Sequence, residues 1–80
     1  DSMEPEIKAG DILIVDRSVP LTSGKIATFY FNGNAICKQY IKRAGKIFLH
    51  SYNLNYQDIE VKDTDDLQLF GVVTGITRDL

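Results

Sequence analysis

The dipeptide Asn32-Gly33 is the feature that most constrains how this chain can fold. It lies between two runs of alternating or apolar residues, 25–31 and 34–41. A two-residue turn of type I′ requires positive φ at both central positions, and Asn followed by Gly is the pair that tolerates this best. The sequence therefore predicts an antiparallel β-hairpin whose register is set by this turn.

Further strand signals follow one another at short intervals, and no segment has a sustained 3.6-residue apolar period. Apolar runs at 12–16, 46–51, 59–61 and 67–77 are separated by turn-forming segments, among them residues 43–45 and the acidic residues 63–66. Gly71 and Gly75 inside the last run predict bulges or close backbone approaches. A chain of 80 residues is too short for several cores, so we expect one mostly β domain over residues 1–80.

Composition and charge argue against several classes of function. The net charge is −2 and the charged residues are interspersed, so we expect no direct nucleic-acid binding by this segment. The longest apolar run, LFGVVTGI, is far shorter than the ~20 residues that span a bilayer. One cysteine and one histidine are too few for an internal disulfide or a zinc site. We therefore expect a cytoplasmic protein without a metal or cofactor.

Lys38 is a charged residue that the sequence places among apolar neighbours in a predicted strand. Strand alternation places it on one face with Ile36 and Tyr40, and turns Cys37 to the other face. One interpretation is a lysine whose stem lies along the surface with its ammonium in water. The other is a buried lysine with a lowered pKa, which in its neutral form takes the proton of a serine hydroxyl. The residues alone leave both open.

Other candidate groups have simpler interpretations. Ser2 follows Asp1, which is suited to capping a short helical turn. His50 has no adjacent nucleophile, which favours a structural or surface histidine, and Cys37 is expected to be a small core residue. The acidic run 63–66 lacks the glycine and glutamate spacing of a calcium loop, so a solvated turn is expected.

The order of motifs resembles a known family. Ser2-Met3 is followed by Gly10-Asp11, the run ILIVDRS, the strand that carries Lys38, the loop NLNYQDI and the closing run FGVVTGI. This order resembles the self-cleaving serine–lysine domain shared by LexA, UmuD and many phage repressors, over almost the whole chain. The loop and the closing run are most similar to UmuD, the accessory subunit of an error-prone DNA polymerase. Cys37 and Gln39 depart from the Val and the basic residue that are usual beside the lysine.

The resemblance implies a fold, a mechanism and partners. The fold would be a LexA/signal-peptidase-like complex of twisted antiparallel sheets forming a partly open barrel. Ser2 would be the nucleophile and Lys38 the general base for self-cleavage in the SOS response to DNA damage. The chain would lack the N-terminal extension that carries the cleavage site. A homodimer would form through the last strand, with Phe70, Val72 and Ile76 on one face. A RecA–DNA filament and the catalytic subunit of an error-prone polymerase would be its partners.

Two alternatives share this fold. In the first, the chain is the self-cleaving and dimerising C-terminal domain of a LexA-like or phage-type repressor, whose operator is bound by a separate helix-turn-helix domain. In the second, it is a non-catalytic β module that serves protein association, and Ser2 and Lys38 have no chemical role.

Overall fold

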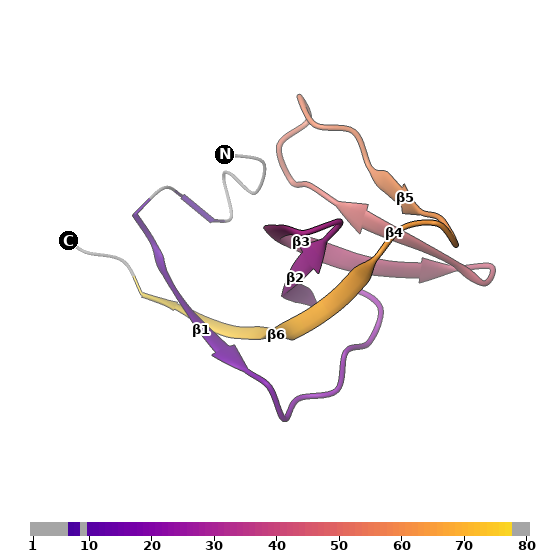
Figure 1. Cartoon of the computed structure of the whole chain (residues 1–80). Helices are drawn as coiled ribbons and strands as arrows, with labels where there is room; N and C mark the ends of the chain where they lie inside the picture. Colours follow the sequence, from indigo (N-terminus) through magenta and orange to yellow (C-terminus); the bar gives the residue numbers. More distant parts are fainter. Residues whose placement is uncertain (1–6, 9, 78–80) are drawn as a thin grey trace.

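All the regular structure in the described part of the chain is β. The computed structural model describes residues 7, 8 and 10–77. Its six strands are β1 (Ile12–Asp16), β2 (Ile26–Phe31), β3 (Asn34–Arg43), β4 (Lys46–His50), β5 (Ile59–Val61) and β6 (Leu67–Thr77). They form one sheet in the order β1-β6-β2-β3-β4-β5, and every neighbouring pair is antiparallel (Figure 1). The predicted mostly β fold class is therefore confirmed.

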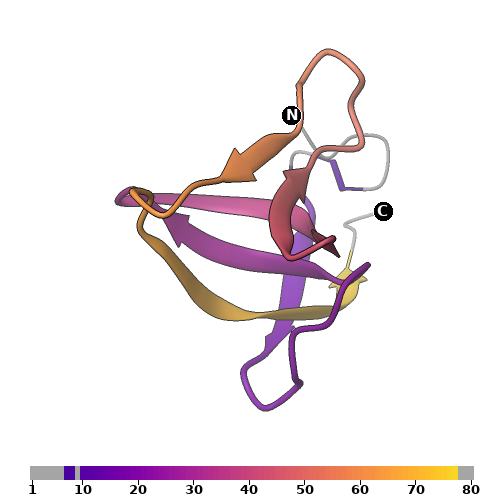
Figure 2. The same ribbon diagram turned by 90° about the vertical axis from the view of Figure 1, so that its right-hand side faces the viewer.

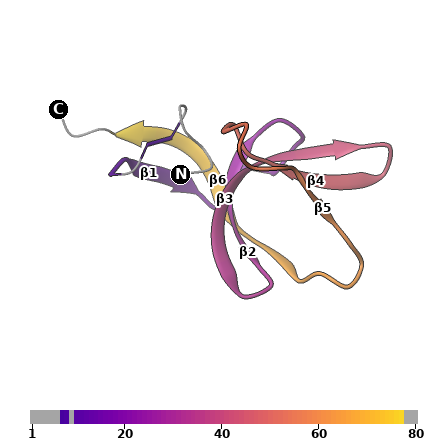
Figure 3. The same ribbon diagram turned by 90° about the horizontal axis from the view of Figure 1, so that it is seen from above.

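The sheet is twisted and open. Its edge strands, β1 and β5, lie on opposite sides of the molecule in Figures 1 and 3. Strand direction turns steadily from β6 through β2 and β3 to β4, which gives the curved profile seen in Figure 2. The antiparallel, twisted character implied by the family resemblance is confirmed, but the strands do not close into a barrel.

The hairpin predicted from Asn32-Gly33 is present. Both residues have positive φ, 49° and 85°, as a type I′ turn requires. The side chain of Asn32 also joins the hairpin to the acidic turn: its Nδ2 donates to Asp65 Oδ1 at 3.0 Å, and its Oδ1 accepts from the Asp66 amide at 2.8 Å. The acidic residues therefore make a structural turn that is tied to the first hairpin.

The turn between β3 and β4 has the same positive φ angles as the Asn32-Gly33 turn, but its first residue, Ala44, is less suited to positive φ. Ala44 and Gly45 have φ of 52° and 76°, close to the values at Asn32 and Gly33. Alanine in the left-handed region costs roughly 1–2 kcal/mol, whereas asparagine is among the residues that tolerate it.

We expect Ala44→Asn to raise the free energy of unfolding, because asparagine is the residue at the equivalent position of the first turn and tolerates positive φ better than alanine does. The gain should be roughly 0.5–1 kcal/mol, since asparagine recovers only part of the strain. Urea denaturation at equilibrium measures it. Gly45→Asn is the matched control and should give no gain, because glycine already adopts positive φ without strain. A destabilised Ala44→Asn variant would contradict this account of the turn.

The core lies on one face of the central strands. Ala27, Phe29 and Leu49 are fully or almost fully buried. Ile36 and Tyr40 of β3 pack against this cluster, which confirms that the face of β3 shared with Lys38 is the inner one. The Phe29 and Tyr40 rings are stacked with centroids 6.4 Å apart.

Two bulges interrupt β6 at the places where its glycines predicted irregularity. Thr28 pairs with Gly71 but Phe29 pairs with Leu69, so Phe70 is passed over. A second shift, between β1 and β6, lies beside Gly75. Each bulge adds one residue to the strand, and the strict alternation of side chains is lost there.

The bulges correct one expectation about the last strand. Phe70, Val72 and Ile76 were expected to share one exposed face, but Val72 is 3% exposed and belongs to the core. Phe70 and Ile76 are 41% and 38% exposed. Strand alternation fails as a guide here because it does not count the extra residues.

Candidate active site

Strand register places Lys38 in the middle of a row of residues that crosses the sheet. Val72 of β6 pairs with Ala27 of β2, and Ala27 pairs with Lys38 of β3. On the other side, Gln39 pairs with His50 of β4, so one step further along the antiparallel ladder Ser51 lies opposite Lys38. Directly opposed residues in neighbouring strands have Cβ atoms roughly 4.5–5.5 Å apart, so their side chains meet on the same face.

The Lys38 side chain is buried in this row. It is 8% exposed, and its Nζ donates a hydrogen bond to Ser51 Oγ at 2.7 Å; Ser51 is 2% exposed. The Tyr56 ring covers the amine with its centroid 5.5 Å from Nζ. Of the two interpretations of Lys38, the structure therefore favours the buried amine over the surface ammonium.

Burial also changes the acid–base behaviour of the amine. Loss of water around Nζ lowers the pKa of Lys38 below its ordinary value, and the neighbouring Cys37 thiol offsets part of this through its charge interaction. Desolvation disfavours the charged form of a lysine, so a larger fraction is neutral near physiological pH. A neutral amine has a lone pair and can accept a proton, which is the property a general base needs.

Ser2, the nucleophile that the resemblance implies, lies outside the described residues. Its role stays a prediction. The nearest described buried residue in sequence is Ile7, which is 5% exposed, so its side chain packs against the domain.

Ser51 is the residue that sequence reasoning missed. The Ala44-Gly45 turn fixes the register of β3 and β4, in which Arg43 pairs with Lys46 and Gln39 pairs with His50. Continued by one residue, this register places Ser51 opposite Lys38. The contact between Ser51 and Lys38 could therefore have been predicted from the sequence by counting residues outward from this second turn. With 2% of its surface exposed, the Ser51 hydroxyl is closed to an external peptide and contacts the lysine instead.

The loop after Ser51 holds Tyr56 over the amine through its own hydrogen bonds. The Asn55 amide donates to Asn53 Oδ1 at 2.9 Å, and the Tyr56 amide donates to the Asn53 carbonyl at 3.0 Å. At the base of the loop, His50 Nδ1 lies 2.6 Å from Asp58 Oδ1. The structural interpretation of His50 agrees with this contact, because its ring joins the two ends of the loop.

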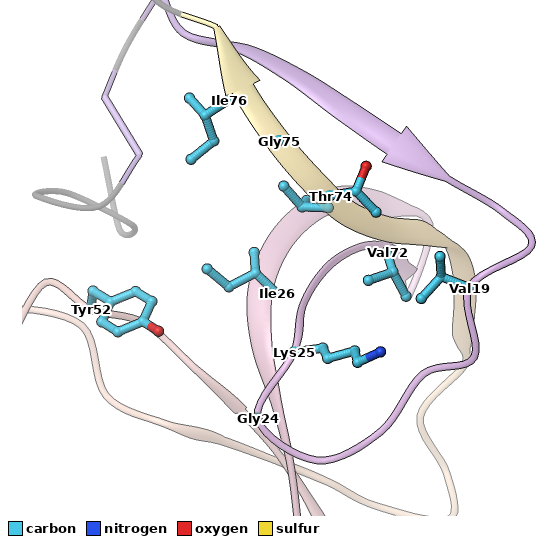
Figure 4. A pocket seen from close by; sticks show the side chains of 10 residues that line it. Val19, Gly24, Lys25, Ile26, Tyr52, Val72, Thr74, Gly75 and Ile76 are labelled. Atoms are coloured by element: carbon cyan, nitrogen blue, oxygen red, sulfur yellow. The ribbon is translucent and has the colours of Figure 1, made fainter.

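An apolar pocket of about 500 Å³ borders the row that contains Lys38 (Figure 4). Ile26 of β2, Tyr52 of the loop, and Val72 and Ile76 of β6 line it, together with residues of the segment before β2. Val72 is a member of the row, and Tyr52 directly follows Ser51. Lys38 is not one of the lining residues, and Ala27 lies between it and Val72 in the row.

The remaining candidate groups do not form a second site. Cys37 was expected to be a small core residue, but it is only partly buried and does not belong to the core cluster, because strand alternation turns it to the face opposite Lys38. Burial raises the pKa of its thiol, so the reactive thiolate is disfavoured. Among residues 7, 8 and 10–77 there is no cluster of His, Cys, Asp and Glu suited to a metal ion. The same part of the chain contains no helix that is long and apolar enough to cross a membrane.

Comparison with known proteins shows the family of the chain. The profile of the Peptidase S24-like family matches residues 1–74, which include Ser2, Lys38 and Ser51. This chain belongs to the Peptidase S24-like family. The LexA repressor of Shewanella piezotolerans is 31% identical over 81 residues, which cover 99% of this chain and 39% of the repressor. The LexA repressor of Syntrophobacter fumaroxidans is 34% identical over 80 residues, which cover 99% of this chain and 38% of the repressor.

The chain is thus an S24 peptidase-like domain related to LexA repressors. It spans less than two fifths of the length of these two relatives. The lysine-bearing β3, the loop with Tyr56 and most of β6 all fall inside the S24 match.

Proposed function

We propose that this domain is the catalytic core of a self-cleaving serine peptidase, with Ser2 as nucleophile and Lys38 as general base. The observation that carries the proposal is the buried Lys38 amine, whose pKa is lowered by loss of water. A serine hydroxyl is too weak a nucleophile unaided, and a neutral amine beside it supplies the missing base. Family membership supports the same chemistry.

The reaction follows from these roles. Neutral Lys38 Nζ takes the proton of Ser2 Oγ while Oγ attacks the carbonyl carbon of the scissile peptide bond. The resulting ammonium returns that proton to the leaving nitrogen as the C–N bond breaks, which leaves an ester on Ser2. Water then attacks the ester, with Lys38 again accepting a proton, and hydrolysis restores the serine. The apolar pocket beside the row is suited to the apolar side chains of the cleaved segment.

For the biological setting we propose a LexA-type repressor that cleaves itself in the SOS response. The two relatives described above, which match nearly the whole chain, are LexA repressors. The resemblance also implies a RecA–DNA filament as the trigger. An UmuD-type accessory subunit of an error-prone polymerase is the second candidate, favoured by the sequences NLNYQDI and FGVVTGITRDL. Specific operator binding by the full-length protein, lost on cleavage, would distinguish the repressor.

We also propose that the domain dimerises through the exposed part of β6. Phe70 makes an edge-on contact with Tyr30, with centroids 6.1 Å apart, and Arg17 lies over the Phe70 ring at 5.2 Å. Aromatic residues and arginine are enriched at the centres of protein interfaces. Ile76, further along the same strand, is 38% exposed and lines the pocket together with Val72. Sedimentation of the Ser2→Ala protein as a monomer at high micromolar concentration would contradict this.

The peptidase proposal is tested by labelling with a serine-reactive fluorophosphonate. We expect the full-length protein to be labelled at Ser2, as located by peptide mass spectrometry, with labelling that increases as the pH is raised. Ser2→Ala and Lys38→Ala should each abolish the signal, and Ser18→Ala is the matched control, since Ser18 is bonded to Asp16 in an exposed turn. Labelling that persists in Ser2→Ala would show that the nucleophile was assigned wrongly.

A further inference from the structure

We propose that Ser51 is a positioning residue that aims the Lys38 amine for proton transfer. The proposal rests on the proposed function, because it assigns a role to Ser51 only if Lys38 is the base. Ser51 lies after the end of β4, and its hydroxyl faces Lys38 across the ladder between β3 and β4.

The first support is the geometry of the contact. Nζ and Oγ are 2.7 Å apart, and both side chains are buried. A lysine side chain has four rotatable bonds before its amine, so burial alone does not fix where the nitrogen points. A short hydrogen bond to an atom of the neighbouring strand removes much of this freedom.

The second support is the direction of the lone pair. A neutral amine has two N–H bonds and one lone pair. When one N–H donates to Ser51 Oγ, that side of the nitrogen is occupied, and the lone pair points away from Ser51. A base must present its lone pair to the proton it takes, and small errors in such alignment are costly. The Tyr56 ring covers the amine as well, which further restricts the directions it can take.

The third support is that Ser51 is unsuited to the other roles a serine could have. It is too buried to attack a peptide itself. A buried serine that only filled space would not need a hydroxyl opposite the one buried lysine of the described chain. The register that places it there is the same register that builds the core, so the contact is held by the whole hairpin.

The test compares Ser51→Ala and Ser51→Thr in the full-length protein by following self-cleavage across a pH series. We expect Ser51→Ala to lower the plateau rate by about 10- to 100-fold, as loss of alignment does in other enzymes. Its midpoint should also move to lower pH. The charged amine loses a stronger hydrogen bond than the neutral amine does, so removal of the hydroxyl disfavours protonation. Ser51→Thr keeps the hydroxyl and should restore most of the rate.

A second measurement follows the pKa of the Lys38 side chain directly, in a protein that does not cleave itself. In a Ser2→Ala background, NMR titration of the Lys38 side chain should show its pKa fall further in Ser51→Ala and return in Ser51→Thr. Thr28→Val is the matched control, because it removes a part-buried hydroxyl that bonds the Gly71 carbonyl on β6. It should change neither the rate–pH profile nor the lysine titration.

The outcomes separate this proposal from the proposed function. Self-cleavage that survives Ser2→Ala would refute Ser2 as the nucleophile, while the lysine titration would still report the contact with Ser51. An unchanged pH midpoint and plateau in folded Ser51→Ala would overturn the positioning role. Unfolding of Ser51→Ala would overturn it too, because it would assign the hydroxyl to stability.

Discussion

Replacement of Lys38 by arginine is expected to abolish self-cleavage at every pH that the folded protein tolerates. Arginine keeps the positive charge and much of the length, but its pKa above ~12 prevents it from accepting a proton. The loss should be about 10²- to 10⁴-fold, the range that general bases contribute. Rates of self-cleavage of the full-length protein, measured by gel electrophoresis over a pH series, give the result.

The parent protein should show the complementary pH dependence. Because burial lowers the pKa of Lys38, the neutral base is formed as the pH rises, and cleavage should increase and then level off. The apparent pKa should lie below the ~10.4 of an unperturbed lysine. Lys42→Arg is the matched control, since Lys42 is an exposed residue of the same strand. Cleavage by Lys38→Arg at near the parental rate would rule out lysine as the base.

Gly71→Ala is expected to destabilise the domain, because a Cβ atom at this position would collide with Val15 Cγ1 of β1. Valine is stiff at χ1 and cannot swing aside freely, so the two strands must separate. Overpacking of this kind costs roughly 1–3 kcal/mol. Equilibrium urea denaturation measures the loss. Because β1 is the strand nearest to Ser2 in sequence, labelling of Ser2 by the fluorophosphonate should fall as well.

Two companion variants make this result specific. In Gly75→Ala the new atom would lie 3.2 Å from Cδ1 of Ile14, the flexible end of a long side chain, so a smaller loss is expected. In the double variant Gly71→Ala with Val15→Ala the collision is removed, and the two changes should cost less together than the sum of their separate costs. Simple additivity would show that Val15 is not what makes glycine necessary at position 71.

Local chemistry made most of the strands predictable. The type I′ turn at Asn32-Gly33 fixed the pairing of β2 with β3, and strand alternation then placed Lys38 on the inner face. The interactions that the sequence did not reveal are those that join distant segments. Bulges in β6 moved Val72 into the core, and the partner of Lys38 depended on a second turn whose alanine is an unusual choice. Register errors accumulate along a strand, so one unrecognised bulge reverses every later side chain.

The position of β6 determines when the domain can be completed during synthesis. In the sheet, β1 is bonded to β6 alone, although the whole of the intervening chain separates them in sequence. The hairpin of β2 and β3 can form as soon as it leaves the ribosome, whereas β1 must wait for the last strand. A ribosome adds roughly 5–20 residues per second, so this wait is a matter of seconds. The strand nearest to Ser2 therefore joins the sheet only after residue 77 has emerged, and under the proposed function we expect a partly made chain to be inactive in self-cleavage.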